Sequence, residues 1–463
     1  MEFRCASCGS AGRSDVLQSV CGRCGGAVIP LLRKVNVRAE ELEERPPGVW
    51  RYREFLPDVG ESVVSLGEGG TPLLRSTRLG ERLGARRMTV KDETRNPTGS
   101  FVDRGTTVLV SAAASKGVKS VEAFTVGDFG ASLAAYCAKA GIEARLAVSP
   151  GAEQGKLIQM IAFGARVELL EGRRTKRGRG ALLTSGNPYL LEGEKTTAFE
   201  IVQDMGWRAP EAIVVPIGSG GHLTAIWMAL RELELSGLVE EAGTRIIGVE
   251  SAFGRGRGRG EGIAELEEPD PPFRASAHRA IRESGGSVIS VNRAESVASV
   301  GELARTEGIF AEPAAASVVA AAKRAMEEGL LDGRSEFVCV VTGSGLKDTR
   351  SIMRLARTPR RSVSSARPFL VPVPIGRTKA ALLRSLQGGS KFGYELWKEL
   401  NEAQSISIPS VYQHLSELEW ASFVRRAERR VAGGRERVYY ELTAKGREAL
   451  RLLSKGGKGY VVY

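Results

Sequence analysis

The chain has 463 residues, of which 42% are hydrophobic and 26% charged, as in ordinary soluble globular proteins. This length exceeds what one hydrophobic core usually holds, so two or three domains are expected. No run of about 20 apolar residues is present, and no apolar run follows a basic start, so we expect a cytoplasmic protein without a membrane span. The net charge of +12 favours acidic partners.

Four of the six cysteines lie near the start of the chain, in the pairs "CASC" and "CGRC". The two-residue spacing lets both thiolates of a pair reach one ion, and four thiolates suit a closed tetrahedral zinc site. The sequence therefore predicts a structural zinc ribbon over residues 1–35, with redox-active cysteine pairs as the alternative. The predicted metal ligands are Cys5, Cys8, Cys21 and Cys24.

The central part of the chain, residues 36–354, alternates short apolar runs with helical patterns. The predicted strands are "RMTVKDE", "VEAFTVG", "EARLAVSP", "RVELLEG", "EAIVVPIGSG", "TRIIGVE" and "EFVCVVTGSG". Helical patterns such as "GASLAAYCAKAG" separate them. This alternation is typical of an α/β fold with a mostly parallel sheet covered by helices. Ligands of such sheets bind at the carboxyl ends of the strands.

Two segments have a different composition. Residues 355–376 are rich in Arg, Ser and Pro without a helical period, which predicts a linker. The repeat "GRGRGRGEG", Gly254–Gly262, is interpreted as a solvated loop, with contact to nucleic acid as the alternative.

The last segment, residues 377–463, has the order helix, helix, helix, hairpin, helix, with the hairpin turn at Gly433–Gly434. That order is typical of a winged helix-turn-helix. The segment holds 16 Lys and Arg against 9 Asp and Glu, so +7 of the net charge of +12 lies here. A basic wing beside a recognition helix predicts binding to double-stranded DNA.

The recognition helix is expected from Pro409 to Glu419. Gln413 could read adenine in the major groove, and Tyr412 could contact a phosphate or a thymine methyl, unless its ring packs in the core. The predicted contacts on this helix are Ser410, Tyr412, Gln413 and His414. The wing would bind backbone phosphates or enter a minor groove through Arg425, Arg426, Arg429, Arg430, Arg435 and Arg437.

Seven ordered motifs over roughly residues 40–353 resemble threonine synthase, a pyridoxal-phosphate enzyme of fold type II, the tryptophan-synthase-β type. These motifs are "GEGGTPLL", "KDETRNPTGSFVDRG", "GASLAAYCAKAG", "NPYLLEGEKTTAFEI", "VPIGSGGHLTAIW", "EGIFAEPAAASVVAA" and "VVTGSGLKD". The zinc ribbon also resembles the start of some members of this family. The resemblance implies a two-subdomain α/β architecture.

The resemblance also implies a ligand pocket. Its phosphate cradle would be the loop Gly218, Ser219, Gly220 and Gly221, since backbone N–H groups at a helix N-terminus attract an anion. Thr342 takes the place of a residue facing the pyridine nitrogen. Further pocket residues are Lys91, Thr98, Ser100 and Arg104, of which Arg104 could pair an anion and Thr98 and Ser100 could equally be turn residues.

Two positions depart from the family pattern. The family has a lysine in "SFKDRG" that forms the Schiff base, and this chain has Val102 there, which can neither hold an aldehyde nor transfer a proton. Where the family has Gly-Asn, with the amide facing the phenolic oxygen of the cofactor, this chain has Gly127 and Asp128, followed by Phe129. A carboxylate there repels a phenolate. The two changes predict a pseudoenzyme that holds pyridoxal phosphate non-covalently at most.

The C-terminal segment resembles a PadR-type winged-helix transcription regulator, on "GYELWKELNE", "SIPSVYQHLSELEW" and "YYELTAKGREAL". The resemblance implies a homodimer that binds DNA. Together the segments predict a transcription regulator that senses a small molecule: an amino acid, a phosphorylated metabolite or non-covalent pyridoxal phosphate. The alternatives are a lyase that uses another lysine, and a non-catalytic partner of a true threonine synthase.

Overall fold

The computed structural model describes residues 1–463 except 14, 126, 150–151, 170–179, 253–262, 264–265, 269–270, 349–372, 404–405, 433–434, 455–459 and 462–463. The chain forms two compact units, Met1–Thr358 and Pro359–Tyr463. The loop 254–262, the Gly433–Gly434 turn and most of the predicted linker lie outside the described residues. Among the described helices, none has both the length and the apolar character that a membrane crossing requires.

The first unit begins with a three-stranded antiparallel sheet in the order β2-β1-β3. Its strands are β1 (Glu2–Cys5), β2 (Ala11–Arg13) and β3 (Val28–Pro30). Phe3, Val28 and two of the cysteines form its small core. Helix α1 (Ala39–Glu43) and the 3-10 helix η1 (Val49–Phe55) then lead into the main body.

A six-stranded sheet in the order β12-β11-β10-β13-β5-β4 forms the larger subdomain. It is parallel except for β4, which runs antiparallel to β5. The strands are β4 (Leu73–Arg75), β5 (Arg87–Asp92), β10 (Ala212–Pro216), β11 (Arg245–Ser251), β12 (Ser287–Val291) and β13 (Glu336–Val341). β10 is buried at every residue, as expected for a central parallel strand.

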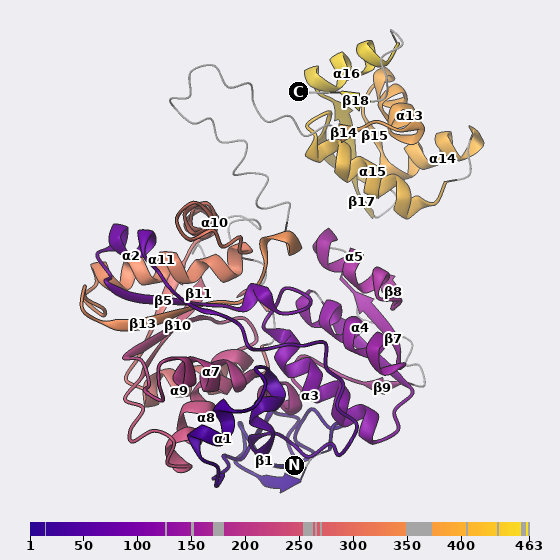
Figure 1. Cartoon of the computed structure of the whole chain (residues 1–463). Coiled ribbons are helices and arrows are strands. Elements are labelled where there is room, and N and C mark those ends of the chain that lie inside the picture. The colour runs from indigo at the N-terminus through magenta and orange to yellow at the C-terminus, as the bar shows by residue number, and fades with distance from the viewer. Residues whose placement is uncertain are drawn as a thin grey trace. The chain divides into compact units, whose positions relative to one another are not determined.

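Helices cover both faces of this sheet (Figure 1). One face packs against α2 (Arg78–Leu83), α10 (Arg293–Glu307) and α11 (Pro313–Glu327). The other face packs against α7 (Thr196–Asp204), α8 (Gly221–Leu235) and α9 (Arg274–Glu283).

A four-stranded parallel sheet in the order β8-β7-β6-β9 forms the smaller subdomain. Its strands are β6 (Ser120–Thr125), β7 (Glu143–Val148), β8 (Arg166–Leu169) and β9 (Ala181–Leu182). Its helices are α3 (Val102–Ser115), α4 (Asp128–Ala140) and α5 (Gln154–Ala162), and α6 (Pro188–Glu194) packs along α3. The short helices η2 (Glu93–Arg95) and η4 (Gly345–Lys347) follow β5 and β13.

The predicted α/β class is confirmed, and each of the seven predicted runs forms a strand. The sequence did not predict β4, β9 and β12. β4 and β9 have only three and two residues, and β12 alternates polar Ser with apolar Val and Ile at the edge of the sheet. Such short strands form because a longer neighbour supplies the pairing edge.

The second unit is a winged helix, as predicted. Its elements are β14 (Val373–Pro374), α13 (Arg377–Ser385), η5 (Leu386–Gly388), β15 (Lys391–Phe392), α14 (Gly393–Ala403), α15 (Ile408–Trp420), β16 (Val424–Ala432), β17 (Arg435–Leu442), α16 (Ala444–Ser454) and β18 (Tyr460–Val461). The wing strands β16 and β17 pair antiparallel, and β15 adds a third strand that the sequence did not predict. The Ser407 side chain caps the predicted recognition helix α15 by accepting from Ser410 N–H.

Candidate functional site

The four N-terminal cysteines converge. Their sulfur atoms all lie within 4.8 Å of one another. The closest contacts join the two pairs, with 3.4 Å from Cys5 Sγ to Cys24 Sγ and 3.9 Å from Cys8 Sγ to Cys21 Sγ. The backbone N–H of Cys8 lowers the pKa of the Cys5 thiol, while its neighbour Cys24 has a raised pKa because its thiol shares hydrogen bonds with the other cysteines, Cys5 foremost. Four such sulfur atoms fit a tetrahedral zinc ion.

The ribbon is fastened to the larger body of the first unit. Asn187 caps α6 and donates to Val16 O over 2.8 Å, which joins the spacer between the cysteine pairs to this helix. Glu232 of α8 accepts from the backbone N–H of Arg33 at 3.0 Å. These contacts place the ribbon against the helices that flank the glycine-rich loop.

The predicted phosphate cradle, Gly218–Gly221, connects β10 to the N-terminus of the 15-residue helix α8. Gly220 has a φ of +83°, and a Cβ on it would come within 2.7 Å of the backbone of Phe273. Only glycine therefore fits there. Backbone N–H groups at the start of a helix attract an anion, and the phosphate cradle stays a prediction.

His222 follows this loop directly, and the sequence did not single it out as a site residue. Its ring stacks on Phe101, with centroids 4.0 Å apart, and its Nε2 lies 3.0 Å from Thr197 Oγ1. Burial lowers the pKa of His222 to about 3, so the ring is neutral at physiological pH. Its position immediately after the glycine-rich loop is the signal that could have indicated it.

The loop that contains Val102 is rigidly bonded. Thr98 donates from its hydroxyl and its N–H to the Asp103 carboxylate, both at 2.7 Å, so its side chain serves the turn. Phe101 N–H donates to Thr342 O at 3.0 Å, which joins the loop to the end of β13. Val102 begins α3 and belongs to the same buried apolar cluster as Phe129.

A group of four charged residues surrounds the Asp128 carboxylate at the start of α4, and we call it the Asp128 cluster: Asp128, Lys156, Lys347 and Glu312. Asp128 Oδ1 lies 3.2 Å from Lys156 Nζ and 3.3 Å from Lys347 Nζ. Ser100 donates its hydroxyl to Oδ2 at 3.1 Å, and Lys156 Nζ is also 3.1 Å from Glu312 Oε2. Although burial acts to raise it, the two ammonium groups hold the pKa of Asp128 far below its ordinary value. The carboxylate is therefore charged.

Arg104 and Lys91 belong to a second group, the Arg104 cluster: Arg104, Lys91, Glu93 and Glu200. Arg104 donates to both carboxylates and to Thr71 and Thr196 over 2.6–3.0 Å. Lys91 Nζ lies 2.9 Å from Glu200 Oε2. The prediction that Arg104 pairs a ligand anion, with Lys91 beside it in the pocket, is therefore corrected: both cations are fully buried and neutralised within the protein.

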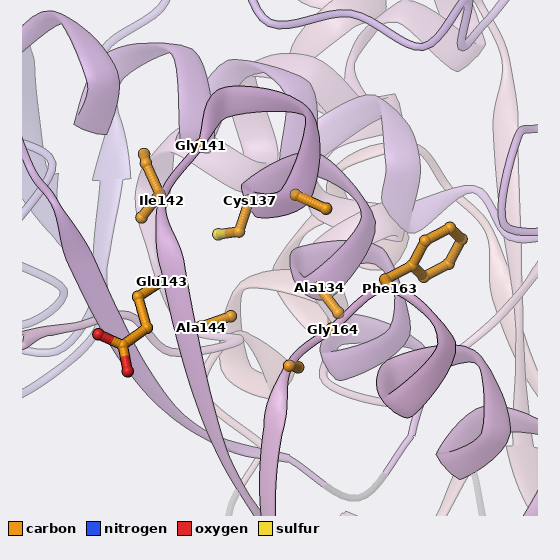
Figure 2. A pocket seen from close by; sticks show the side chains of 10 residues that line it. Ala134, Cys137, Gly141, Ile142, Glu143, Ala144, Phe163 and Gly164 are labelled. Carbon is orange, nitrogen blue, oxygen red and sulfur yellow. The ribbon is translucent and has the colours of Figure 1, made fainter.

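A separate cavity of about 310 Å³ lies between α4, β7 and the end of α5 (Figure 2). Small side chains dominate its lining: Ala134, Cys137, Ala138, Gly141, Ile142, Glu143, Ala144, Phe163, Gly164 and Ala165. Burial raises the pKa of Cys137 to about 12, so this thiol is unreactive. None of the predicted site residues is among those that line this cavity.

On the predicted recognition helix, Tyr412 and Gln413 are exposed, while Ser410 and His414 are half-buried. The ring of Tyr412 lies against the Gly393 backbone, where an added Cβ would come within 2.4 Å of it. The Tyr412 ring therefore packs against the start of α14 on one side and stays exposed to solvent on the other. In the wing, Arg425 pairs with Glu441, and Arg426 Nε lies 3.0 Å from Glu419 Oε1. The side chains of Arg429, Arg430, Arg435 and Arg437 lie outside the described residues.

Two family descriptions match the chain. Residues 64–343 match "Pyridoxal-phosphate dependent enzyme". The chain belongs to this family. Residues 382–452 match "Transcriptional regulator PadR-like family". Both resemblances expected from the sequence are therefore confirmed.

Curated relatives cover about three quarters of the chain. Threonine synthase of Methanocaldococcus jannaschii is 38% identical over 77% of this chain and 95% of its own length. Threonine synthase of Methanosarcina acetivorans is 34% identical over the same shares. Among solved structures, O-ureido-L-serine synthase matches with a TM-score of 0.49 and 21% identity, over 60% of this chain and 90% of that one.

Proposed function

We propose that the protein is a transcription regulator that senses a small molecule with a non-catalytic, threonine synthase-like domain. The observation that carries this proposal is the joining, in one chain, of a pyridoxal-phosphate enzyme domain to a PadR-like domain. If "NPTGSFVDRG" corresponds to the family motif that it resembles, Val102 stands where the family has its catalytic lysine. An apolar side chain there supplies neither an amine nor a base.

The state of the other amines near this loop supports the loss of catalysis. Lys91, Lys156 and Lys347 each lie within 3.3 Å of a buried carboxylate oxygen. A nucleophilic amine must be accessible, and these three amines are buried in ion pairs. The residues present therefore fit the phosphate of pyridoxal phosphate at the Gly218–Gly221 loop but provide no group for its aldehyde.

On the DNA side, the exposed face of α15 with Tyr412 and Gln413 would enter the major groove of duplex DNA. The basic wing would bind phosphates and contribute affinity more than specificity. We propose that the protein acts as a homodimer, because two copies of a winged helix read two half-sites. A ligand switches such binding only when it favours one arrangement of the domains over another.

The test is binding to duplex DNA from upstream of the protein's own gene, against a scrambled duplex of equal length. We expect preference for the upstream duplex and an affinity that falls steeply with salt, because phosphate contacts release counterions. Gln413→Ala should remove the preference, and Arg425→Ala with Arg426→Ala should weaken both duplexes equally. Arg75→Ala, an exposed arginine of the first unit, is the matched control. Equal binding of wild-type protein to both duplexes would contradict the proposal.

A further inference from the structure

We propose that the Asp128 cluster is a binding site for a zwitterionic α-amino acid, and that Asp128 bars pyridoxal phosphate and other phosphorylated ligands from it. This inference names the ligand class of the proposed regulator. It depends on the proposed function only for the statement that the ligand controls DNA binding. Four observations carry it: the charge balance of the cluster, the exposure of its members, a neighbouring unsatisfied acceptor, and the residue at position 102.

The charges of the Asp128 cluster balance. Two ammonium groups, of Lys156 and Lys347, face two carboxylates, of Asp128 and Glu312. A ligand with net negative charge would bring an anion that no unpaired cation of the cluster neutralises, and a buried unpaired charge is costly. A ligand with one cation and one anion keeps the balance, since its carboxylate can pair with a lysine while its ammonium pairs with Asp128.

Asp128 is the member of the cluster that an incoming ligand meets first. Its side chain is 14% exposed, whereas those of Lys156 and Lys347 are 2% and 1% exposed. The Oδ1 atom that faces the lysines is buried, so a ligand would reach the carboxylate from the side of Oδ2. A carboxylate that is more exposed than the lysines behind it attracts an approaching ammonium group and repels a phosphate.

Gln159 adds an acceptor beside the cluster. It lies three residues after Lys156 on α5, and its Nε2 donates to Thr98 O, the same carbonyl that accepts from Lys347 Nζ at 2.9 Å. Its Oε1 is buried and has no hydrogen-bond partner among the described residues. A buried acceptor without a donor is unfavourable, and an ammonium group has three N–H donors to offer. Gln159 Oε1 can accept one of them.

Two residues of this site are unfavourable for the binding of pyridoxal phosphate. By the family resemblance, position 128 faces the phenolic oxygen of the cofactor, where a charged carboxylate is repulsive. Val102 provides no amine that could offset that repulsion with a covalent bond. The glycine-rich loop retains its geometry, so the exclusion acts through Asp128 and Val102 and leaves the phosphate cradle unused.

The first experiment measures binding of the twenty standard L-amino acids, with O-phospho-L-serine and O-phospho-L-threonine as matched phosphorylated probes, by calorimetry on the full chain. We expect at least one amino acid to bind, and serine and threonine to bind at least about 10-fold more tightly than their phosphorylated forms. Asp128→Asn keeps the shape and removes the charge. It should weaken the bound amino acid by about 10-fold or more and reduce or reverse the preference against phosphate. Glu143→Gln, a half-buried carboxylate on β7, should change neither.

Binding of no amino acid, tighter binding of the phosphorylated probes to wild-type protein, or an unchanged ratio in Asp128→Asn would each overturn the proposal. DNA binding is measured on the same samples. A protein that binds an amino acid without binding duplex DNA refutes the regulator and leaves the amino-acid site standing. A protein that binds duplex DNA but no amino acid refutes the amino-acid site and leaves the regulator standing.

The second experiment tests the exclusion of pyridoxal phosphate. Wild-type protein, Val102→Lys, Asp128→Asn and the double variant are incubated with pyridoxal phosphate, reduced with borohydride and weighed by mass spectrometry. We expect the adduct on the introduced amine to be scarce in Val102→Lys alone and at least about 10-fold more abundant in the double variant. Equal amounts in both, with near-ultraviolet circular dichroism like that of wild-type protein, would show that Asp128 excludes nothing.

Discussion

The Arg104 cluster and the Asp128 cluster are both buried groups of two cations and two carboxylates, and they differ in how completely they are satisfied. In the Arg104 cluster, every N–H of the guanidinium has an acceptor and the side chains of Arg104 and Glu93 are fully buried. In the Asp128 cluster, the central carboxylate is partly exposed and the neighbouring Gln159 Oε1 lacks a donor among the described residues. A buried ion cluster whose polar atoms all have partners within the protein stabilises the fold. A cluster that leaves a polar atom without a partner can still bind a ligand.

The largest effect is expected from breaking the saturated cluster. Arg104→Met leaves Glu93 and Glu200 buried without their main cation, and removing one partner of a buried ion pair costs about 3–5 kcal/mol. The free energy of unfolding, measured with urea, should fall by that amount. Arg75→Ala, which removes an exposed arginine, should change it by less than about 0.5 kcal/mol. A loss in Arg104→Met as small as that of the control would show that the cluster does not stabilise the fold.

Glu194 is a buried carboxyl group that, unlike those of the two clusters, has no ion pair among the described residues. Burial raises the pKa of Glu194 to about 8, and its Oε2 has no hydrogen-bond partner among the described residues. Because this pKa is above the unfolded value of about 4.3, stability from the neutral carboxyl is complete below about pH 4 and is lost as the pH rises to about 8. Glu194→Gln should remove this loss, which for a pKa rise from about 4.3 to about 8 is at most about 5 kcal/mol. Unfolding measured from acid to mildly alkaline pH checks it, and parallel curves for the two proteins would contradict it.

Breaking the unsaturated cluster should cost less than breaking the saturated one. In Asp128→Asn, Lys156 keeps Glu312 and Lys347 keeps the Thr98 carbonyl, so the expected loss is about 1–2 kcal/mol, the range of single hydrogen bonds to charged groups. The low pKa of Asp128 means that its contribution is present above about pH 4 and is lost only in strong acid. Urea unfolding of both variants in one series gives the ranking, and a larger loss in Asp128→Asn than in Arg104→Met would reverse the comparison.

The smallest effect is expected outside both clusters, at the ribbon contact. Asn187→Ala removes a helix cap and the bond to Val16 O, and should cost about 1 kcal/mol. Asn292→Ala removes the capping residue of α10, a helix on the opposite side of the large sheet from α8, and should cost a similar amount. Limited proteolysis distinguishes them, because only Asn187→Ala should speed release of the N-terminal segment. Equal release from both variants would show that this bond does not hold the ribbon.

The sequence predicted what depends on local spacing. The cysteine pairs, the seven apolar runs and the order of the winged-helix elements all lie within short stretches, and each formed as expected. The partners of Arg104 could not be predicted, because Glu200 is 96 residues away on α7, the helix that follows α6, and α6 in turn packs along α3. The pairing of Asp128 with Lys347 likewise depends on the loop after β13. Thr98 and Arg104 were assigned to a pocket because sequence order does not reveal which polar side chains satisfy one another.

The docking of the ribbon has a consequence for the order of folding during synthesis. Residues 1–35 leave the ribosome well before the residues they dock against, and their cysteines are close enough in sequence to take up a metal ion at once. Their docking partners come much later: Asn187 lies 171 residues after Val16, and Arg279, which donates to Ala6 O, lies 273 residues after that residue. The last of these docking partners, Arg279, is therefore made 273 residues after the segment that it contacts. The ribbon can therefore fold long before its docking surface is complete, and metal binding is what can keep it folded in the interval.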